Sequence, residues 1–208
     1  MTLLFVVWIL SNGKDLPFAL AGGIIALTTS VGIFEAGNIA FFRFDLRYVD
    51  LLITTATTKM DFLLGEIFGA LAWAFPGFII YLLLDLYMHL LNPISFVLTL
   101  FIIGIVLIST SSIAFWISGL TKTSRNVWGL TSLLSIFMTI IPPTFYSYTL
   151  LPKPILYLLS IFPTTPAAVL EQGLFGIAPM DWSMLAILII ETIVYLVLGI
   201  YLIKWRDE

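Results

Sequence analysis

The stretch FRFDLRYVDLLITTATTKMDFLLGE, residues 42–66, determines how the chain is interpreted, because it holds the densest charge in a strongly apolar sequence. It lies between two long apolar runs and mixes both signs of charge with apolar residues. Its charged residues are Arg43, Asp45, Arg47, Asp50, Lys59, Asp61 and Glu66. A charged amphipathic stretch between two membrane-spanning runs predicts a helical connection outside the membrane.

The composition indicates a membrane protein. Of 208 residues, 61% are hydrophobic and 10% are charged, whereas soluble domains average about 25% charged residues. So few charged side chains cannot cover the surface of a soluble fold of this size. The nine Lys and Arg residues are scattered, so we expect no nucleic-acid partner. The absence of cysteine excludes disulfides and cysteine-ligated metals.

The hydropathy pattern predicts one all-α membrane domain over residues 1–208, a six-span helical bundle whose first span is incomplete. A span needs about 20 apolar residues to cross roughly 30 Å of hydrocarbon. The predicted spans cover residues 17–42, 63–88, 94–120, 127–149 and 182–203, after a partial span at about 1–11. Small residues permit close helix approach. Those expected to do so are Gly22, Gly23, Gly32 and Gly37, with a GxxxG pair at Gly65 and Gly69 for packing between two copies.

Prolines interrupt the region between the last two predicted spans. Pro142 and Pro143 are expected to stop or kink a helix, and five more prolines follow up to Pro179. The apolar segments between them are too short to cross a membrane. We therefore expect re-entrant or interfacial half-helices at the outer membrane edge, within residues 155–176.

The positive residues predict the orientation, because loops rich in Lys and Arg face the cytoplasm. Seven fall on one side, and only Lys14 and Lys153 fall on the other. The seven are Arg43, Arg47, Lys59, Lys122, Arg125, Lys204 and Arg206. We expect a multi-pass protein of the cytoplasmic (inner) membrane, with the 43–62 segment and both chain termini in the cytoplasm.

Acidic residues inside spans are functional candidates, because each costs roughly 2.5 to 3.5 kcal/mol to insert. Glu35, with Asn38 one turn on, and Glu191 are the main cases. They line a translocation path, or they are hydrogen-bonded to another helix or kept protonated by burial. Asp85 and Glu66 lie near predicted span ends, where they are expected to reach the interface.

Catalytic and nucleotide-binding motifs are absent from the sequence. It contains neither HExxH nor GxxxxGK[ST], and its single histidine, His89, has no second ligand in view. We therefore expect no enzyme activity and no bound cofactor, so energy from ATP would have to come from a partner. The charged stretch is then a lever on the membrane domain or an interfacial helix on lipid headgroups. Its three basic and four acidic residues favour a protein surface over an anionic lipid surface.

Over nearly its whole length the chain resembles the type-2 permeases of ATP-binding cassette (ABC) exporters. These typically show Arg-Glu-x-Gly-Thr-x-Glu-x-Leu-Leu after the second span, then Thr-Pro, then Leu-Leu-Gly-Lys. Here residues 43–52 read RFDLRYVDLL, Thr55 and Ala56 follow, and residues 63–66 read LLGE. Asp50 replaces the family's Glu, and Ala56 replaces its Pro. Similar features are the basic loop at 122–125, a fifth span that ends in Pro-Pro, and FPTTP at 162–166, like the family's Asn-Pro-Leu-Thr-Tyr.

The resemblance implies that the cytosolic stretch is a coupling helix that docks on a separate ABC ATPase subunit holding ATP and Mg. It also implies a dimer with a second permease copy or homologue, exporting a drug, lipid or glycan-lipid. The implied coupling residues are Arg43, Arg47, Asp50, Thr54, Thr55, Lys59 and Asp61. Two other possibilities remain open: an ion-coupled secondary transporter using Glu35 and Glu191, or a membrane assembly subunit without a transport path.

Overall fold

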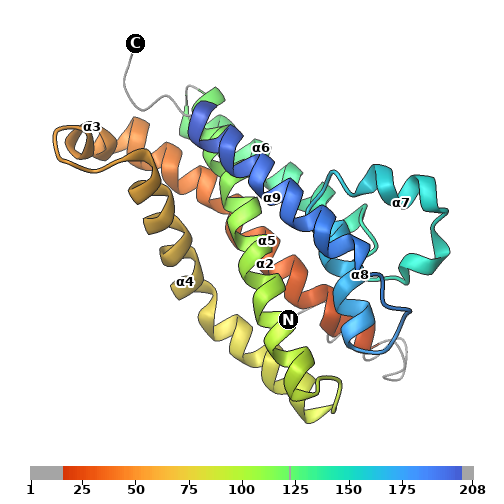
Figure 1. The fold of residues 1–208 in the computed structure, drawn as a ribbon. Coiled ribbons are helices and arrows are strands. Elements are labelled where there is room, and N and C mark those ends of the chain that lie inside the picture. Colours follow the sequence, from red (N-terminus) through yellow and green to blue (C-terminus); the bar gives the residue numbers. More distant parts are fainter. Residues whose placement is uncertain (1–15, 122, 203–208) are drawn as a thin grey trace.

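The protein is seen in a computed structural model that describes residues 16–121 and 123–202. Within these residues it is all-α, with eight α-helices and no strand (Figure 1), which confirms the predicted class. The helices are α2 (Leu16–Ala40), α3 (Tyr48–Ile53), α4 (Lys59–Tyr87), α5 (Pro93–Leu120), α6 (Ser124–Ile140), α7 (Lys153–Leu159), α8 (Thr164–Leu174) and α9 (Ser183–Leu202). A π-helix, η1 (Phe41–Asp45), continues α2, and a short 3-10 helix, η2 (Tyr148–Leu150), precedes α7.

Four helical segments are long and apolar enough to cross a membrane. They are Leu16–Asp45, Lys59–Tyr87, Pro93–Leu120 and Ser183–Tyr201. The pair α7 and α8, bent by 119°, makes a fifth if it is one broken span. The chain is therefore a multi-pass membrane protein, and four predicted spans are confirmed to within a few residues. The partial first span at 1–11 lies outside the described residues, so the described part supports four or five spans rather than six.

The predicted span at 127–149 is wrong in its boundaries. Helix α6 begins at Ser124 and ends at Ile140, and 17 residues at 1.5 Å each reach only about 25 Å. It ends there because Pro142 has no N–H to donate and its ring clashes with the carbonyl four residues earlier. The chain then turns, with the Thr144 N–H donating to the Pro142 carbonyl at 2.7 Å.

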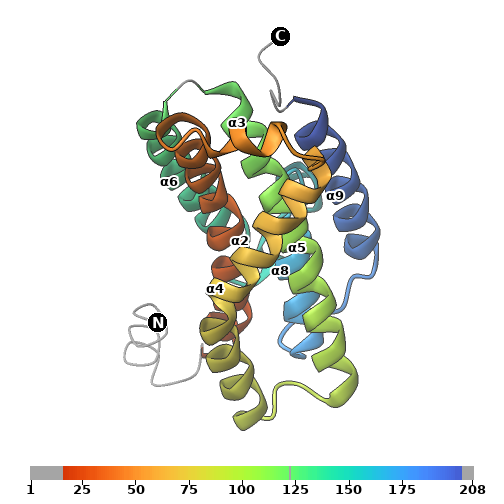
Figure 2. The same cartoon turned by 90° about the vertical axis from the view of Figure 1, so that its left-hand side faces the viewer.

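Helix α2 lies at the centre of the bundle, packed against α4, α5, α6 and α8 (Figure 2). Sixteen of its 25 residues are buried, against eight of 29 in α4. Glycine makes this packing possible. A Cβ added at Gly22 would lie 2.1 Å from the Thr144 carbonyl oxygen, and one at Gly32 would lie 2.0 Å from Thr110 Oγ1. The predicted close approach at α2 is confirmed, as an added Cβ at Gly23 or Gly37 would lie 2.4 Å from the Tyr81 ring or 2.6 Å from the Trp128 ring.

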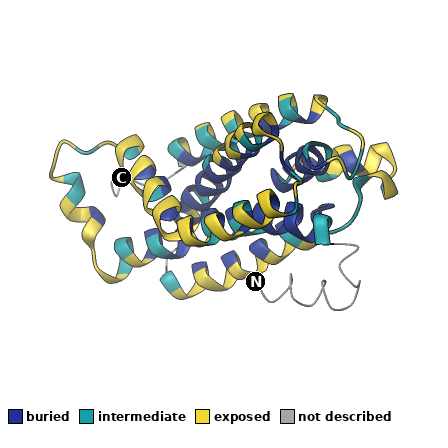
Figure 3. Ribbon diagram, turned by 90° about the horizontal axis from the view of Figure 1, so that it is seen from below, coloured by how far each residue is buried: buried dark blue, intermediate teal, exposed yellow. Residues whose placement is uncertain are grey.

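Large apolar side chains cover the outer surface of the bundle, where exposed residues alternate with buried ones along the helices (Figure 3). On α4 the exposed side chains include Phe68, Trp73 and Tyr87, the latter two more than 80% exposed. An apolar outer surface of this extent suits a hydrocarbon solvent.

The two ends of the bundle differ in their number of basic residues. Helix α3, the end of α5, the start of α6 and the end of α9 lie at one end, and the turn between α4 and α5 lies at the other (Figures 1 and 2). Arg43, Arg47, Lys59 and Arg125 belong to the segments at the α3 end. Lys153 begins α7, which lies away from α3 (Figure 1). The other positions in the charge count, Lys14, Lys122, Lys204 and Arg206, lie outside the described residues.

The half-helices predicted within residues 155–176 are present as α7 and α8, but only α7 is exposed. Leu156 is its one buried residue, whereas nine of the eleven residues of α8 are buried. Helix α8 packs against α2, α5 and α9. It is therefore part of the core rather than an interfacial helix, because its small residues fit among the spans.

Candidate functional site

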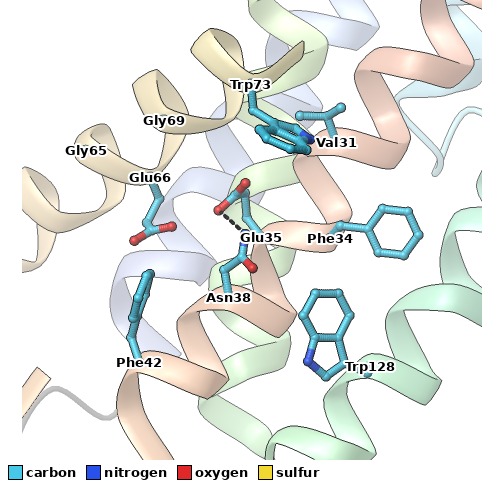
Figure 4. Close-up of a pocket in the computed structure, with 10 residues that line it drawn as sticks. All are labelled: Val31, Phe34, Glu35, Asn38, Phe42, Gly65, Glu66, Gly69, Trp73 and Trp128. Atoms are coloured by element: carbon cyan, nitrogen blue, oxygen red, sulfur yellow. Dashed lines mark hydrogen bonds between the residues drawn. The ribbon is translucent and has the colours of Figure 1, made fainter. Parts of the chain in front are cut away.

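A cleft of about 710 Å³ lies between α2, α4 and α6. Its walls combine two acids, an amide, four aromatic rings and two glycines (Figure 4). The lining residues are Val31, Phe34, Glu35, Asn38, Phe42, Gly65, Glu66, Gly69, Trp73 and Trp128. Clefts of this size with few polar groups are typical of small-molecule sites.

Two carboxyl groups face each other in the cleft. Glu35 lies on α2 and Glu66 on α4, and Glu66 points across the cleft toward Glu35 (Figure 4). The Asn38 amide, one turn along α2, donates a hydrogen bond from Nδ2 to Glu35 Oε2 at 3.3 Å. Two like charges in weakly polar surroundings repel unless a proton or a cation lies with them. This part of the cleft therefore favours positive charge.

Aromatic rings form the rest of the cleft wall. Trp128 projects from α6 over Gly37, where an added Cβ would lie 2.6 Å from the indole ring. Phe34 packs on the same indole, with ring centroids 6.3 Å apart. Trp73 enters from α4 on the opposite side of the acids (Figure 4). The wall thus presents indole faces on both sides of the carboxyl groups.

The structure brings four predicted site residues together, since Glu35, Asn38, Gly65 and Gly69 all line this cleft. A Cβ added at Gly65 or Gly69 would meet no described atom within 4 Å, so neither glycine serves packing between the described helices. Glu191 is elsewhere, on α9, with both carboxyl oxygens buried and no hydrogen-bond partner in the described part of the chain. Glu66 was expected at the interface and instead faces Glu35.

The charged connection predicted at 43–62 runs through η1, α3 and a short turn at the end of the bundle (Figure 1). Arg47 adopts a left-handed conformation, φ 50°, that turns the chain into α3. Val49 is the only buried residue of α3, and Asp50 is exposed. Half of this helix, Tyr48, Asp50 and Leu51, is exposed and therefore available to another surface.

The other predicted coupling residues have local partners. The Arg43 guanidinium lies 5.3 Å from the centroid of the Phe44 ring. Thr54 and Thr55 donate their hydroxyls to the Leu51 and Leu52 carbonyls, each at 2.7 Å. Lys59 is the first residue of α4.

Asp61 helps to begin α4. Its carboxylate accepts from the Thr58 N–H at 2.9 Å, while Thr58 Oγ1 accepts from the Asp61 N–H at 3.2 Å. This reciprocal capping box satisfies N–H groups at the helix start. Because α4 starts at a fixed point, the exposed connection is joined firmly to the helix that carries Glu66.

Sequence reasoning missed a second buried polar cluster. Thr99 on α5 donates to Glu171 on α8, Oγ1 to Oε2, at 2.9 Å, and Glu171 is fully buried. Asp85 on α4, which was expected to reach the interface, is also fully buried, with no partner for either carboxyl oxygen among the described residues. Gln172 bonds the irregular 143–148 segment. The sequence signal for this cluster was the adjacent acid and amide, Glu171 and Gln172, in a segment whose other residues are mostly small or apolar.

No protein-family model matches the chain, and no curated protein matches it either. What is established is a membrane protein with several spans, a cleft lined by acids and aromatic rings, and an exposed charged connection. Function is therefore argued from these features.

Proposed function

We propose that this chain is the permease subunit of an ABC exporter, moving a hydrophobic or amphipathic substrate across the cytoplasmic membrane. One observation carries the proposal. The exposed charged connection joins α2 directly to α4, and these are the two helices whose carboxyl groups face each other in the cleft. A force applied to the connection would change the separation of the cleft walls.

The properties of the connection support a protein partner. It carries both signs of charge and exposes half of the residues of α3, whereas adhesion to anionic lipid would favour basic residues alone. The motif that resembles the coupling helix of type-2 permeases occupies these same residues. In this proposal a separate ATPase binds ATP and Mg, docks on the connection, and drives the substrate through the cleft.

A second copy of the chain, or a homologue, completes the proposed exporter. Gly65 and Gly69 leave the α4 backbone open, as the GxxxG motif does where two membrane helices approach closely. They also line the cleft. A partner helix on this face would supply a further wall of the path.

The test is charge reversal on the connection. The tagged chain is purified from its native membranes, and ATPase activity recovered with it is measured. Asp50→Lys should lower that recovery about tenfold, because reversing a charge at a docking surface places like charges together. Lys153→Glu, an exposed charge reversal at α7, should leave it unchanged. Equal recovery with Asp50→Lys and with the original chain would contradict the coupling role.

An ion-coupled transporter is the second candidate, and the facing carboxyl groups of Glu35 and Glu66 favour it. The two candidates differ in their energy source. Purified chain in proteoliposomes that moves substrate on a proton or sodium gradient, with no ATPase added, would support the second candidate and exclude the first. An assembly subunit would show no transport under either condition.

A further inference from the structure

We infer that the cleft between α2, α4 and α6 binds a lipophilic organic cation, a molecule with one positive charge and aromatic or aliphatic bulk. This inference rests on the proposed function only in taking the cleft as the place where substrate binds. It goes beyond that function by specifying the chemistry of the substrate.

The sign of the ligand follows from the charges. Among the described residues, the cleft lining contains the carboxyl groups of Glu35 and Glu66 and no Lys, Arg or His. A cation that lies between the two carboxyl groups removes their mutual repulsion, whereas an anion adds to it. An anionic lipid headgroup is therefore disfavoured at this position.

The bulk of the ligand follows from the walls and the volume. Trp73 and Trp128 flank the acids (Figure 4), and indole faces attract cations within about 6 Å of the ring. A cleft of about 710 Å³ is far larger than a metal ion and matches a drug-sized molecule. Within residues 16–121 and 123–202 there is also no group of three His, Cys, Asp or Glu that could hold a metal.

The chain provides a route for such a molecule from the membrane. The cleft is open to the exterior of the bundle, and Trp73 at its edge is 84% exposed. A lipophilic cation concentrates in the apolar part of a bilayer and can enter sideways past this indole. The carboxyl groups then hold its charge, and the rings cover its apolar parts.

The test measures binding of tetraphenylphosphonium to the purified full chain in neutral detergent by equilibrium dialysis, with no ATPase present. Tetraphenylborate, of the same shape and opposite charge, is the matched probe. We expect saturable binding of the phosphonium ion and none of the borate. Glu35→Gln and Glu66→Gln should each weaken phosphonium binding about tenfold, because each removes one of the two carboxyl groups that lie opposite the cation in a weakly polar site. Asp181→Asn, the same change of an acid to its amide at a residue outside the cleft lining, should have no effect.

Trp73→Leu provides a variant that does not disturb the fold, because this side chain is already exposed. It should weaken phosphonium binding about threefold to tenfold through loss of the indole face, while Trp182→Phe outside the cleft should not. Equal binding of the two probes, absence of saturable phosphonium binding, or unchanged binding in both Glu35→Gln and Glu66→Gln would overturn the inference. Since no ATPase is present, these outcomes are independent of the coupling test on Asp50.

Discussion

At the scale of single residues, the hydrogen bond from Thr99 to Glu171 is the clearest test of how the core is held. Both side chains are fully buried, and Glu171 Oε1 has no partner among the described residues. Thr99→Val removes the hydroxyl without changing the shape, so Glu171 loses the one side-chain donor that it has among the described residues. We expect a loss of about 1 to 3 kcal/mol in the free energy of unfolding, measured by thermal unfolding in detergent.

Thr99→Ser is the control for this prediction. It keeps the hydroxyl and removes one methyl group, which costs about 1 kcal/mol. If Thr99→Val were as stable as the original protein and Thr99→Ser were not, packing rather than the hydrogen bond would matter at this position.

The sequence identifies buried polar residues only where the surrounding element is predicted correctly. Glu35 and Asn38 lie inside a long apolar run, so they stood out, and the structure places them together in the cleft. Glu171 lies in a short segment between prolines, for which the sequence predicts a re-entrant or interfacial half-helix at the membrane edge, so the sequence does not predict its burial in the core. Asp85 is three residues from the start of a turn, yet packing of α4 buries it.

At the scale of elements, Gln172 secures the break between α6 and α7. Its Nε2 donates to the Pro143 and Tyr146 carbonyls at 2.6 and 2.9 Å, and its Oε1 accepts from the Tyr148 N–H at 3.1 Å. Helix α8 thereby satisfies backbone groups that the prolines leave without helical partners. Pro142 and Pro143 predict the break in the helix from the sequence. The sequence does not predict that Gln172 forms hydrogen bonds to this segment, because Gln172 is about 30 residues further along the chain.

Gln172→Glu tests this role, because a carboxylate cannot donate to the two carbonyls. We expect a loss of about 2 to 4 kcal/mol in the free energy of unfolding and faster proteolysis within residues 143–149. Asn92→Asp is the matched control, since Asn92 only accepts, from the Ser95 N–H at 2.8 Å, and Asp retains that acceptor. Equal stability of both variants would show that the Gln172 bonds do not hold the segment.

At the scale of the whole molecule, four of the spans were predictable and the cleft was not. Hydropathy alone places the helices of a membrane protein, because each must bond its own backbone groups in lipid. Which faces meet depends on side-chain shape, such as the absence of a Cβ at Gly32 beside Thr110. Glu35 and Glu66 face each other because of that packing. The positions of the two acids along the sequence therefore could not predict that they would meet.

The open glycines of α4 lead to a prediction about assembly. The sequence contains no cysteine, so any disulfide between two copies must form at the single cysteine that is introduced. Gly69→Cys should form a disulfide-linked dimer in native membranes under mild oxidation, because a disulfide needs Cα atoms within about 7 Å and GxxxG faces allow that approach. Gly104→Cys is matched, since its Cβ position on α5 is equally open, and should remain monomeric. Cross-linking of both variants, or of neither, would remove α4 as the dimer face. If only Gly69→Cys forms the cross-link, the α4 face that lines the cleft meets the partner copy. The carboxyl groups and indole rings of each cleft would then lie beside the partner copy, as a transport path between two copies requires.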